Sequence, residues 1–307
     1  MNFIKAKDPE LKAALVELIR NKIRFENEKE YYDVEQDKQF IKDYYCTIDF
    51  NLEDKKELYK QLSQLITRTH VNQLAYNAKT RDLLYTRVDL HVDGTLKSIY
   101  SGKEKNPEQV VREDYETDRK RKEAHDLLLV SNLNNDDFQQ AVTSIHQENM
   151  FNCEHVVPQS WFHEDNPMRG DLHHLFTCEK DCNSARSNYP YFDFVDYPPK
   201  VATEAVKDHC GKYEEGKFEP ESGKGEVARA TLYFLLRYPG EISRYHKKDI
   251  EMLLNWHREN KVSIYEKHRN KEIFHIQKNR NPLIDFPQLA DKIDFMSGFY
   301  TKGHAHF

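Results

Sequence analysis

Residues 151–162 read FNCEHVVPQSWF, so that an acid, Glu154, and an imidazole, His155, stand side by side at the end of a short apolar run. Neighbouring residues on a β-strand point to opposite faces. Both side chains can therefore serve one site only if the strand ends or kinks between them. Pro158 supplies a break of this kind, because proline cannot donate a hydrogen bond to a sheet.

Two more polar segments follow this stretch. One is Asp171-Leu172-His173-His174-Leu175-Phe176, and the other is Cys182-Asn183-Ser184-Ala185-Arg186-Ser187-Asn188. Together the three segments form a dense polar cluster, and we expect the chemistry of the protein to lie there.

The composition favours a folded domain and argues against two classes of protein. Only 38% of the residues are apolar, but 18 tyrosines and 17 phenylalanines are enough for a packed core. The formal charge of −6 argues against a passive nucleic-acid-binding protein, although it does not exclude an enzyme with a locally basic cleft. No run of about 18 apolar residues is present, so we expect no membrane span.

The cellular compartment stays open. The first twenty residues contain acids and lack an apolar segment before a small-residue cleavage site, so no signal peptide is visible. Both an intracellular protein and one secreted from a longer precursor fit this start. The five cysteines are an odd number, which leaves at least one unpaired and favours a reducing compartment.

Helical spacing of apolar residues recurs towards both ends of the chain. Asp8-Pro9-Glu10 and Asp54 have the residue types that begin helices, and Ser263-x-x-Glu266 is a capping box. We predict helices at residues 11–23, 58–66, 138–145, 225–238, 249–260 and from Ser263 towards Arg280. Residues 103–126 are dense in charge and include Arg119-Lys120-Arg121-Lys122; we interpret them as a solvated helix face in preference to a nucleic-acid contact.

Strand-like alternation appears between residues 84 and 92, where inward and outward residue types alternate. Asp93-Gly94 then supplies a two-residue turn, and residues 96–100 return as the partner strand. With no internal repeat in the chain, we predict one mixed α+β domain with a small antiparallel sheet and flanking helices. It comprises an N-terminal helical extension at 1–50, a main domain at 51–290 and a tail at 291–307, and we expect a monomer.

The polar cluster suits the hydrolysis of a phosphodiester. The imidazole of His155 can take a proton from water at neutral pH, because its unperturbed pKa is near ~6.5. Mg²⁺ prefers hard oxygen ligands and is held by one or two protein oxygens plus substrate phosphate. The Glu154 carboxylate and the Asn183 amide oxygen would be such a sparse ligand set, with Mn²⁺ or Ca²⁺ as substitutes for Mg²⁺.

The three segments resemble the endonuclease I family of His-metal finger (ββα-metal) nucleases. They match at residues 152–158, 171–175 and 183–188, in the family's order and at compatible spacing. Weaker similarity extends the match to roughly residues 60 to 290, through Thr69-His70, Asp93-Gly94, Gly225–Ala230 and Asn279–Pro282. The resemblance implies a core of two strands and a helix near residues 151–190 that clamps one divalent ion.

The resemblance also implies a role for each matching residue. The family's general base is the histidine that follows a metal-binding glutamate, so His155 corresponds to the base and Glu154 to one metal ligand. The asparagine that opens the Asn-x-x-Arg-Ser-Asn segment is the other ligand, which corresponds to Asn183. An arginine that neutralises the scissile phosphate is expected, and Arg169 and Arg186 are both candidates.

Several positions have more than one interpretation. Asn152 stands where some family members have a second acid, so a third metal ligand is in doubt. His173 and His174 could orient a ligand or the base, or be hydrogen-bonded core histidines. Arg186 could equally form a structural salt bridge. A tetrahedral zinc site, free thiols and a disulfide are the alternatives for four cysteines: Cys153, Cys178, Cys182 and Cys210.

Two functions of different classes follow. The first is a divalent-metal-dependent, sequence-tolerant endonuclease that cuts DNA, with RNA left open, to 5′-phosphate and 3′-hydroxyl ends. The second is a non-catalytic nucleic-acid-binding or zinc-stabilised interaction module on the same fold. The complete set of Glu154, His155 and Asn183 favours the enzyme, because a binding module would not need it.

Overall fold

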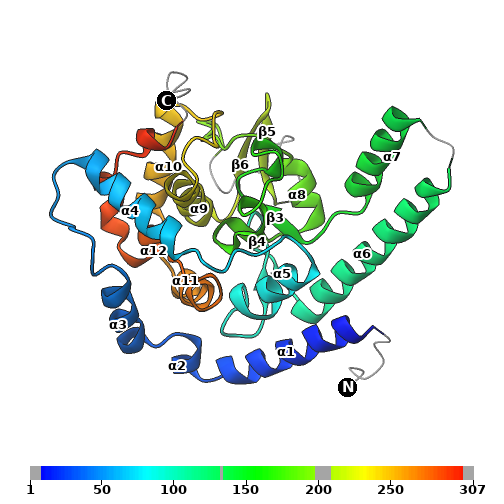
Figure 1. Ribbon diagram of the computed structural model, residues 1–307, viewed down its shortest axis with the longest axis horizontal. Coiled ribbons are helices and arrows are strands. Elements are labelled where there is room, and N and C mark those ends of the chain that lie inside the picture. Colours follow the sequence, from blue (N-terminus) through cyan, green and yellow to red (C-terminus); the bar gives the residue numbers. More distant parts are fainter. Residues whose placement is uncertain (1–7, 132–133, 198–208, 300–307) are drawn as a thin grey trace.

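The computed structural model describes residues 8–131, 134–197 and 209–299. Helices surround three small sheets, and the long helices α6 and α7 form a hairpin at one side (Figure 1). The helices are α1 (Pro9–Phe25), α2 (Glu28–Tyr31), α3 (Val34–Tyr44), α4 (Lys55–Thr69), α5 (Ala78–Leu83), α6 (Pro107–Leu129), α7 (Asn135–Glu148), α8 (Lys180–Arg186), α9 (Lys224–Arg237), α10 (Lys247–Glu259), α11 (Ile264–Gln277) and α12 (Pro282–Asp285). The strands are β1 (Leu96–Lys97), β2 (Glu104–Lys105), β3 (Cys153–His155), β4 (Leu175–Thr177), β5 (Gly211–Glu214) and β6 (Lys217–Pro220).

The predicted α+β class is confirmed, with the strands divided among three antiparallel pairs, β1–β2, β3–β4 and β5–β6. The predicted helix starts are confirmed as well. Asp8 accepts hydrogen bonds from the first turn of α1, Asp54 does the same for α4, and Ser263 with Glu266 forms the capping box of α11. Helix α11 ends at Gln277, earlier than predicted, because Lys278 takes a left-handed conformation with φ 75°.

Two hydrophobic clusters meet at the β3–β4 hairpin. The larger cluster surrounds α9 and includes Phe176 of β4, whereas the smaller one lies between α1 and α6 and includes Leu175. Successive residues of a strand face opposite sides, so the hairpin is packed on both faces. Residues of the predicted N-terminal extension belong to both clusters, Leu15 and Leu18 to the smaller and Tyr45 to the larger.

The strand predicted from Leu84 to Val92 is wrong. Helix α5 continues into a π-helical turn at Leu84–Val88, closed by a hydrogen bond of 2.8 Å from the Asp89 amide to the Leu84 carbonyl. The turn at Asp93-Gly94 is present, with Gly94 at φ 74°. The residues after it pair elsewhere, because β1 lies against β2 and not against residues 84–92.

The alternation of residue types at 84–92 suggested a strand, but its polar members have partners inside the protein. Tyr85 is fully buried and donates a hydrogen bond of 2.6 Å to Asp114. Arg87 forms an ion pair with the buried Glu272 of α11. Tyr85 and Arg87 are therefore polar because each pairs with a charged residue of the interior, not because the alternation marks a face turned to water.

Helix α11 carries charged side chains into the interior. Glu266, Arg269 and Glu272 are each about 2% exposed, and buried charges of this kind must be paired. The pairs are Glu266–Arg229, Arg269–Asp89, Glu272–Arg87 and, just beyond the helix, Arg280–Asp37.

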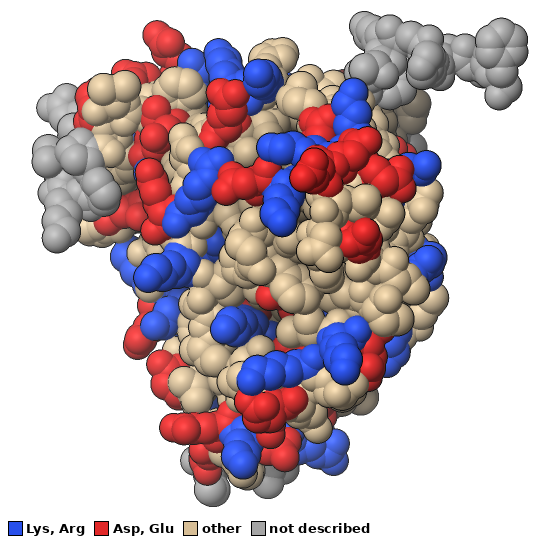
Figure 2. Space-filling model, turned by 90° about the vertical axis from the view of Figure 1, so that its left-hand side faces the viewer, with Lys and Arg blue, Asp and Glu red and all other residues tan. Residues whose placement is uncertain are grey.

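The outer surface mixes both signs of charge. Figure 2 shows the side of the molecule on which α3 and α4 lie, where Lys and Arg side chains are interspersed with Asp and Glu around an uncharged area. Within the described ranges, no helix is both long enough and apolar enough to cross a bilayer.

The Glu272 pairing predicts a pH-dependent stability. Burial alone would raise the pKa of Glu272, but Arg87, His268 and Lys271 lower it to about 2. Because the folded pKa lies below the unfolded value, the carboxylate stabilises the fold above pH ~4.5 and loses this effect as the pH falls towards 2, by ~3 kcal/mol at most. Glu272→Gln should therefore lower the free energy of unfolding at pH 7, and the difference from the parent should shrink between pH 5 and 3.

Denaturant titration at several pH values measures this difference. Glu35→Gln is the matched control, because Glu35 is exposed and pairs only with the exposed Lys38. A difference that stays constant down to pH 3 would contradict the role given to Glu272.

Candidate active site

The β3–β4 hairpin and α8 form two strands followed by a helix, as the resemblance implies. Glu154 pairs with Phe176 and His155 with Leu175. Pairing therefore runs through both Glu154 and His155, and the break predicted between them is absent. The strand ends after His155, with one more hydrogen bond of 2.9 Å from the Val156 amide to the His174 carbonyl.

Glu154 is buried in a polar environment on the α8 side of the hairpin. Its Oε1 accepts a hydrogen bond of 2.6 Å from the Tyr100 hydroxyl and lies 3.4 Å from Nε of Arg186. Tyr100 in turn contacts the hydroxyl of Tyr191 at 2.8 Å. Burial raises the pKa of Glu154 to about 7, although Arg186 and Tyr100 act in the opposite direction. Both contacts are made to one oxygen, and Oε2 receives no side-chain hydrogen bond from the described residues.

Asn183 of α8 is oriented by the backbone of β3. Its Nδ2 donates a hydrogen bond of 2.9 Å to the Cys153 carbonyl, which leaves the amide oxygen Oδ1 as the atom able to bind a ligand. The structure describes no group of three or more His, Cys, Asp or Glu side chains that could hold a metal. One carboxylate and one amide oxygen nevertheless fit a hard cation that keeps other positions for water and substrate, as Mg²⁺ does.

His155 lies on the other side of β3 and is about 6% exposed. Its Nε2 is 3.0 Å from the carbonyl oxygen of Arg169. A carbonyl can only accept, so we assign the proton to Nε2 and leave Nδ1 as the basic nitrogen. The ring of Tyr76 packs edge-on at 4.7 Å. Burial, aided by His174, holds the pKa of His155 well below its usual value, so the ring is neutral at neutral pH.

The two candidate arginines have different environments. The Arg186 side chain is 1% exposed, and besides Glu154 it donates hydrogen bonds to the carbonyls of Val156, at 2.7 Å, and Ser187, at 3.2 Å. The Arg169 side chain is 32% exposed and binds Glu164 at 3.0 Å. Arg186 is thus surrounded by protein, whereas Arg169 can reach a bound molecule.

A cleft adjoins His155 on the side of Arg169. It has a volume of about 930 Å³ and lies between α1, α5 and α6. Tyr76 and Arg169 belong to its lining and both contact His155. The other charged residues that line it are Asp8, Glu10, Arg81, Arg112, Glu116, Asp118, Arg119, Arg121 and Lys122. Basic residues outnumber acidic ones there, in contrast to the net charge of −6 for the whole chain.

The basic run in α6 supports the interpretation as a helix surface. Arg119 pairs with Glu116 and Glu123 on its own helix, and Lys120 also pairs with Glu116. Arg121 donates to the carbonyls at the end of α7, at His146 and Asn149.

The remaining polar residues of the motif are internal. The amide group of Asn152 contacts Asp114 and Lys105 at 3.0 and 2.9 Å, away from Glu154. His174 is fully buried and donates from Nε2 to the Met168 carbonyl at 2.7 Å, while its ring packs against His155 at 5.6 Å. His173 lies 3.4 Å from the Asn279 carbonyl. Both histidines are therefore hydrogen-bonded core residues, and His174 also touches the ring of His155.

Of the three alternatives for the four cysteines, the structure shows a disulfide and free thiols in place of a zinc site. Cys182 and Cys210 form a disulfide, while Cys153 and Cys178 are buried free thiols and Cys46 is exposed. The disulfide removes two of the required ligands and joins α8 to the start of β5. Disulfides are rare in reducing compartments, so this one argues against the reducing compartment that the odd number of cysteines favoured.

Two aromatic residues of the site were missed by the sequence reasoning. Tyr100 contacts Glu154 and Tyr76 contacts His155, but each lies more than 50 residues before the motif. Tyr100 ended a predicted strand and Tyr76 belonged to no recognised pattern. Neither carries a local signal that points to Glu154 or His155.

The unit that carries Glu154, His155 and Asn183 has the strand–strand–helix order of the ββα-metal class. Comparison with known proteins gives the family: the sequence model for Endonuclease I matches residues 54–288. The chain belongs to the endonuclease I family.

Individual relatives act on different polymers, according to their names. The chain is 34% identical to an extracellular ribonuclease of Bacillus subtilis over 140 residues, which are 40% of this chain and 46% of the relative. It is 29% identical to an extracellular deoxyribonuclease of Aeromonas hydrophila over 158 residues, 45% of this chain and 66% of the relative. The matched part thus spans less than two thirds of either relative.

The different burial of the two arginines predicts different effects of their removal. Arg186→Ala should lower the free energy of unfolding by ~3–5 kcal/mol, because it leaves the buried Glu154 without its positive partner. Arg169→Ala should change it by less than ~0.5 kcal/mol, as substitutions at accessible positions usually do. Denaturant unfolding of both variants measures the contrast, and equal losses of stability would show that Arg169 is also a structural residue.

Proposed function

We propose that the protein is a divalent-metal-dependent endonuclease that hydrolyses phosphodiester bonds with little dependence on sequence. One observation carries the proposal. His155 and Asn183 each bind a backbone carbonyl through one nitrogen, which leaves Nδ1 of the imidazole and Oδ1 of the amide for reaction and for ligation. A protein that only binds nucleic acid has no need for either arrangement.

His155 is the general base in this proposal. Its pKa, lowered by burial, keeps the ring neutral, so Nδ1 can take a proton from the attacking water. The Arg169 carbonyl holds the ring in this orientation, and the Arg169 guanidinium contacts the scissile phosphate from the cleft. Arg186 stabilises the carboxylate of Glu154 and does not reach the substrate.

Glu154 and Asn183 would hold the divalent cation, Mg²⁺ or Mn²⁺ or Ca²⁺ in its place. A cation bound there would relieve negative charge on the phosphate and on the departing 3′ oxygen. Tyr100 and Arg186 fix the Glu154 carboxylate through Oε1, so that Oε2 is the oxygen left for the ligand.

The substrate is DNA, RNA or both. The relatives named as ribonuclease and deoxyribonuclease support a site that does not depend on the sugar. The cleft beside Arg169 would hold the nucleotides next to the cut. Arg169 is the basic residue of this lining that we assign to the phosphate, because Arg119 and Arg121 are engaged within the protein. The alternative is a non-catalytic nucleic-acid-binding or zinc-stabilised module, and its four-cysteine zinc site would lack the two cysteines that form the disulfide.

Two substitutions separate the base from the metal ligands. His155→Ala should reduce cleavage of a plasmid by ~10²–10⁴-fold while metal binding stays as in the parent, because only proton abstraction is lost. Asn183→Ala should weaken metal binding and raise the Mg²⁺ concentration needed for cleavage. Calorimetric titration with Mg²⁺, together with digestion with and without EDTA, gives both quantities.

Glu113→Gln is a suitable control for the metal titration, because this carboxylate contacts Asn152 and not Glu154 or Asn183. A His155→Ala variant that cleaves at the full rate would exclude the assigned base. Unchanged Mg²⁺ affinity in Asn183→Ala would move the metal site elsewhere.

The cut ends are predicted as well. If a water activated by His155 attacks phosphorus and displaces the 3′ oxygen, the sugar 2′ position takes no part. Both polymers should then give 5′-phosphate and 3′-hydroxyl ends, measured by mass spectrometry of fragments from matched DNA and RNA oligonucleotides. A 2′,3′-cyclic phosphate on the RNA products, with intact DNA, would overturn the mechanism even if His155 proved essential.

A further inference from the structure

The Arg169 carbonyl is held in place by the segment Met168–Asp171, which connects the base to the interior. Gly170 lies so close to the preceding loop that a Cβ there would be 1.9 Å from the Leu74 carbonyl oxygen. On the other side, His174 donates from its ring to the Met168 carbonyl at 2.7 Å. The backbone around Arg169 is thus restrained both before and after the residue.

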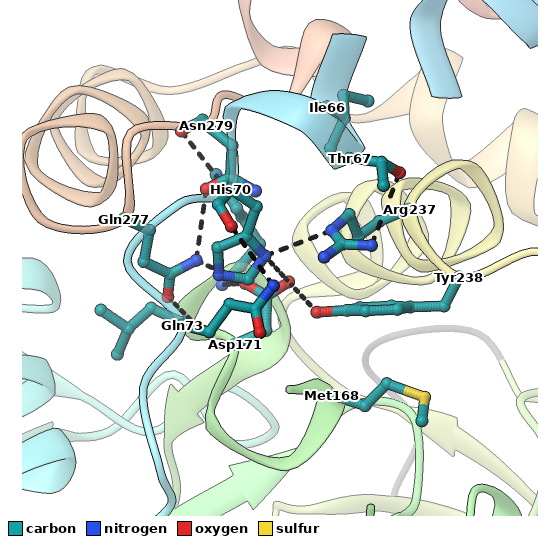
Figure 3. Close-up of polar contacts among 12 residues, drawn as sticks. Ile66, Thr67, His70, Gln73, Met168, Asp171, Arg237, Tyr238, Gln277 and Asn279 are labelled. Carbon is teal, nitrogen blue, oxygen red and sulfur yellow. Dashed lines mark hydrogen bonds and ion pairs between the residues drawn. The ribbon is translucent and has the colours of Figure 1, made fainter. Parts of the chain in front are cut away.

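Asp171 anchors this segment through four hydrogen bonds. Its Oδ1 accepts from the His173 amide at 3.0 Å and from Gln277 at 2.9 Å. Its Oδ2 accepts from the hydroxyl groups of Tyr233 and Tyr238 at 2.8 and 2.9 Å. Figure 3 shows Asp171 between Tyr238 and Gln277, which come from the end of α9 and from α11.

The carboxylate is fully buried and stays ionised. Burial alone would raise the pKa of Asp171, but the neighbouring histidines and the Gln277 hydrogen bond lower it below its usual value. The carboxylate also orients its own loop, because three of its four donors come from α9 with its C-cap and from α11, while the fourth is the nearby His173 amide.

A second layer of contacts surrounds Asp171 and its donors. Asn279 donates to the hydroxyl of Tyr233 at 2.6 Å. Nε of Arg237 donates to Nδ1 of His70 at 3.2 Å, so the proton of His70 lies on Nε2 and its ring is neutral (Figure 3). His70 ends α4, with Nδ1 4.0 Å from Asp171, so helix α4 also packs on the anchor.

We propose that Asp171 is a positioning residue for His155. Through its four hydrogen bonds it fixes the Met168–Asp171 segment, and the Arg169 carbonyl then holds His155 in the tautomer that is protonated on Nε2. This inference rests on the proposed role of His155 as general base. Asp171 does not touch the substrate, so its effect is confined to the orientation and tautomer of the base.

The experiment is Asp171→Asn in the 307-residue chain. The amide group cannot accept at both positions, so at least one pair of donors loses its acceptor. We expect kcat for a DNA oligonucleotide to fall by ~10–100-fold, as outer contacts of functional groups usually give, with KM and metal-free DNA binding unchanged. Long-range ¹H–¹⁵N NMR of the histidine rings should show that His155 is no longer held as the Nε2-protonated form.

Asp37→Asn is the matched control. Asp37 is also a buried carboxylate, about 1% exposed, but it pairs with Arg280 and has no contact with the Met168–Asp171 segment. This variant should lose stability while kcat and the His155 ring signals remain those of the parent. If Asp171→Asn does not fold, Tyr233→Phe with Tyr238→Phe takes its place, since the pair removes both donors to Oδ2 and keeps the rings.

The outcomes separate this inference from the proposed function. A folded Asp171 variant with the parent's kcat, or with an unchanged His155 tautomer, would overturn the positioning role and leave His155 as the base. A kcat loss of equal size in Asp37→Asn would show that the effect is only loss of stability. Full activity of His155→Ala would instead overturn the proposed function.

Discussion

The hairpin β3–β4 pairs only three residues on each strand, and an isolated two-stranded hairpin is marginal in water even when it is longer. The rest of the fold must therefore hold it. Asp89, after the π-helical turn, accepts hydrogen bonds from the amide and hydroxyl of Thr177, at 2.6 and 2.8 Å. Arg269 of α11 donates to the carbonyls of Leu172 and Leu175, both at 2.9 Å. Asp89 and Arg269 also pair with each other, so one buried ion pair clamps the outer edge of β4.

The other edge of the hairpin is held by α8. Asn183 bonds to the Cys153 carbonyl, and the neighbouring Cys182 forms the disulfide with Cys210. Burying Glu154 is tolerable only because Arg186 and Tyr100 are buried with it. Glu154 and the proposed base His155 thus share one small sheet but depend on different supports. Glu154 depends on α8, which also carries Asn183, and His155 depends on the segment Met168–Asp171.

The sequence predicted those features that depend on local chemistry. Helix starts at Asp8, Asp54 and Ser263 were recognisable because a capping side chain bonds to residues two or three positions later. The strand at 84–92 was mispredicted because the partner of Arg87 is Glu272, 185 residues away, and no local pattern shows that pairing. For the same reason the resemblance pointed to Glu154, His155 and Asn183 but not to Tyr100. It could not choose between Arg169 and Arg186, because exposure follows from tertiary packing.

The β3–β4 hairpin is held by residues of α11, which are synthesised long after it, and this affects when the hairpin becomes stable. Arg269 and Gln277, which hold β4 and Asp171, follow the motif by about 100 residues. A growing chain that has left the ribosome only up to residue 200 already contains Glu154, His155 and Asn183, but neither α9 nor α11. Glu154 and His155 then lie in a hairpin that is too short to persist alone. The proposed active site is therefore expected to reach its final geometry only after residue 277 has left the ribosome.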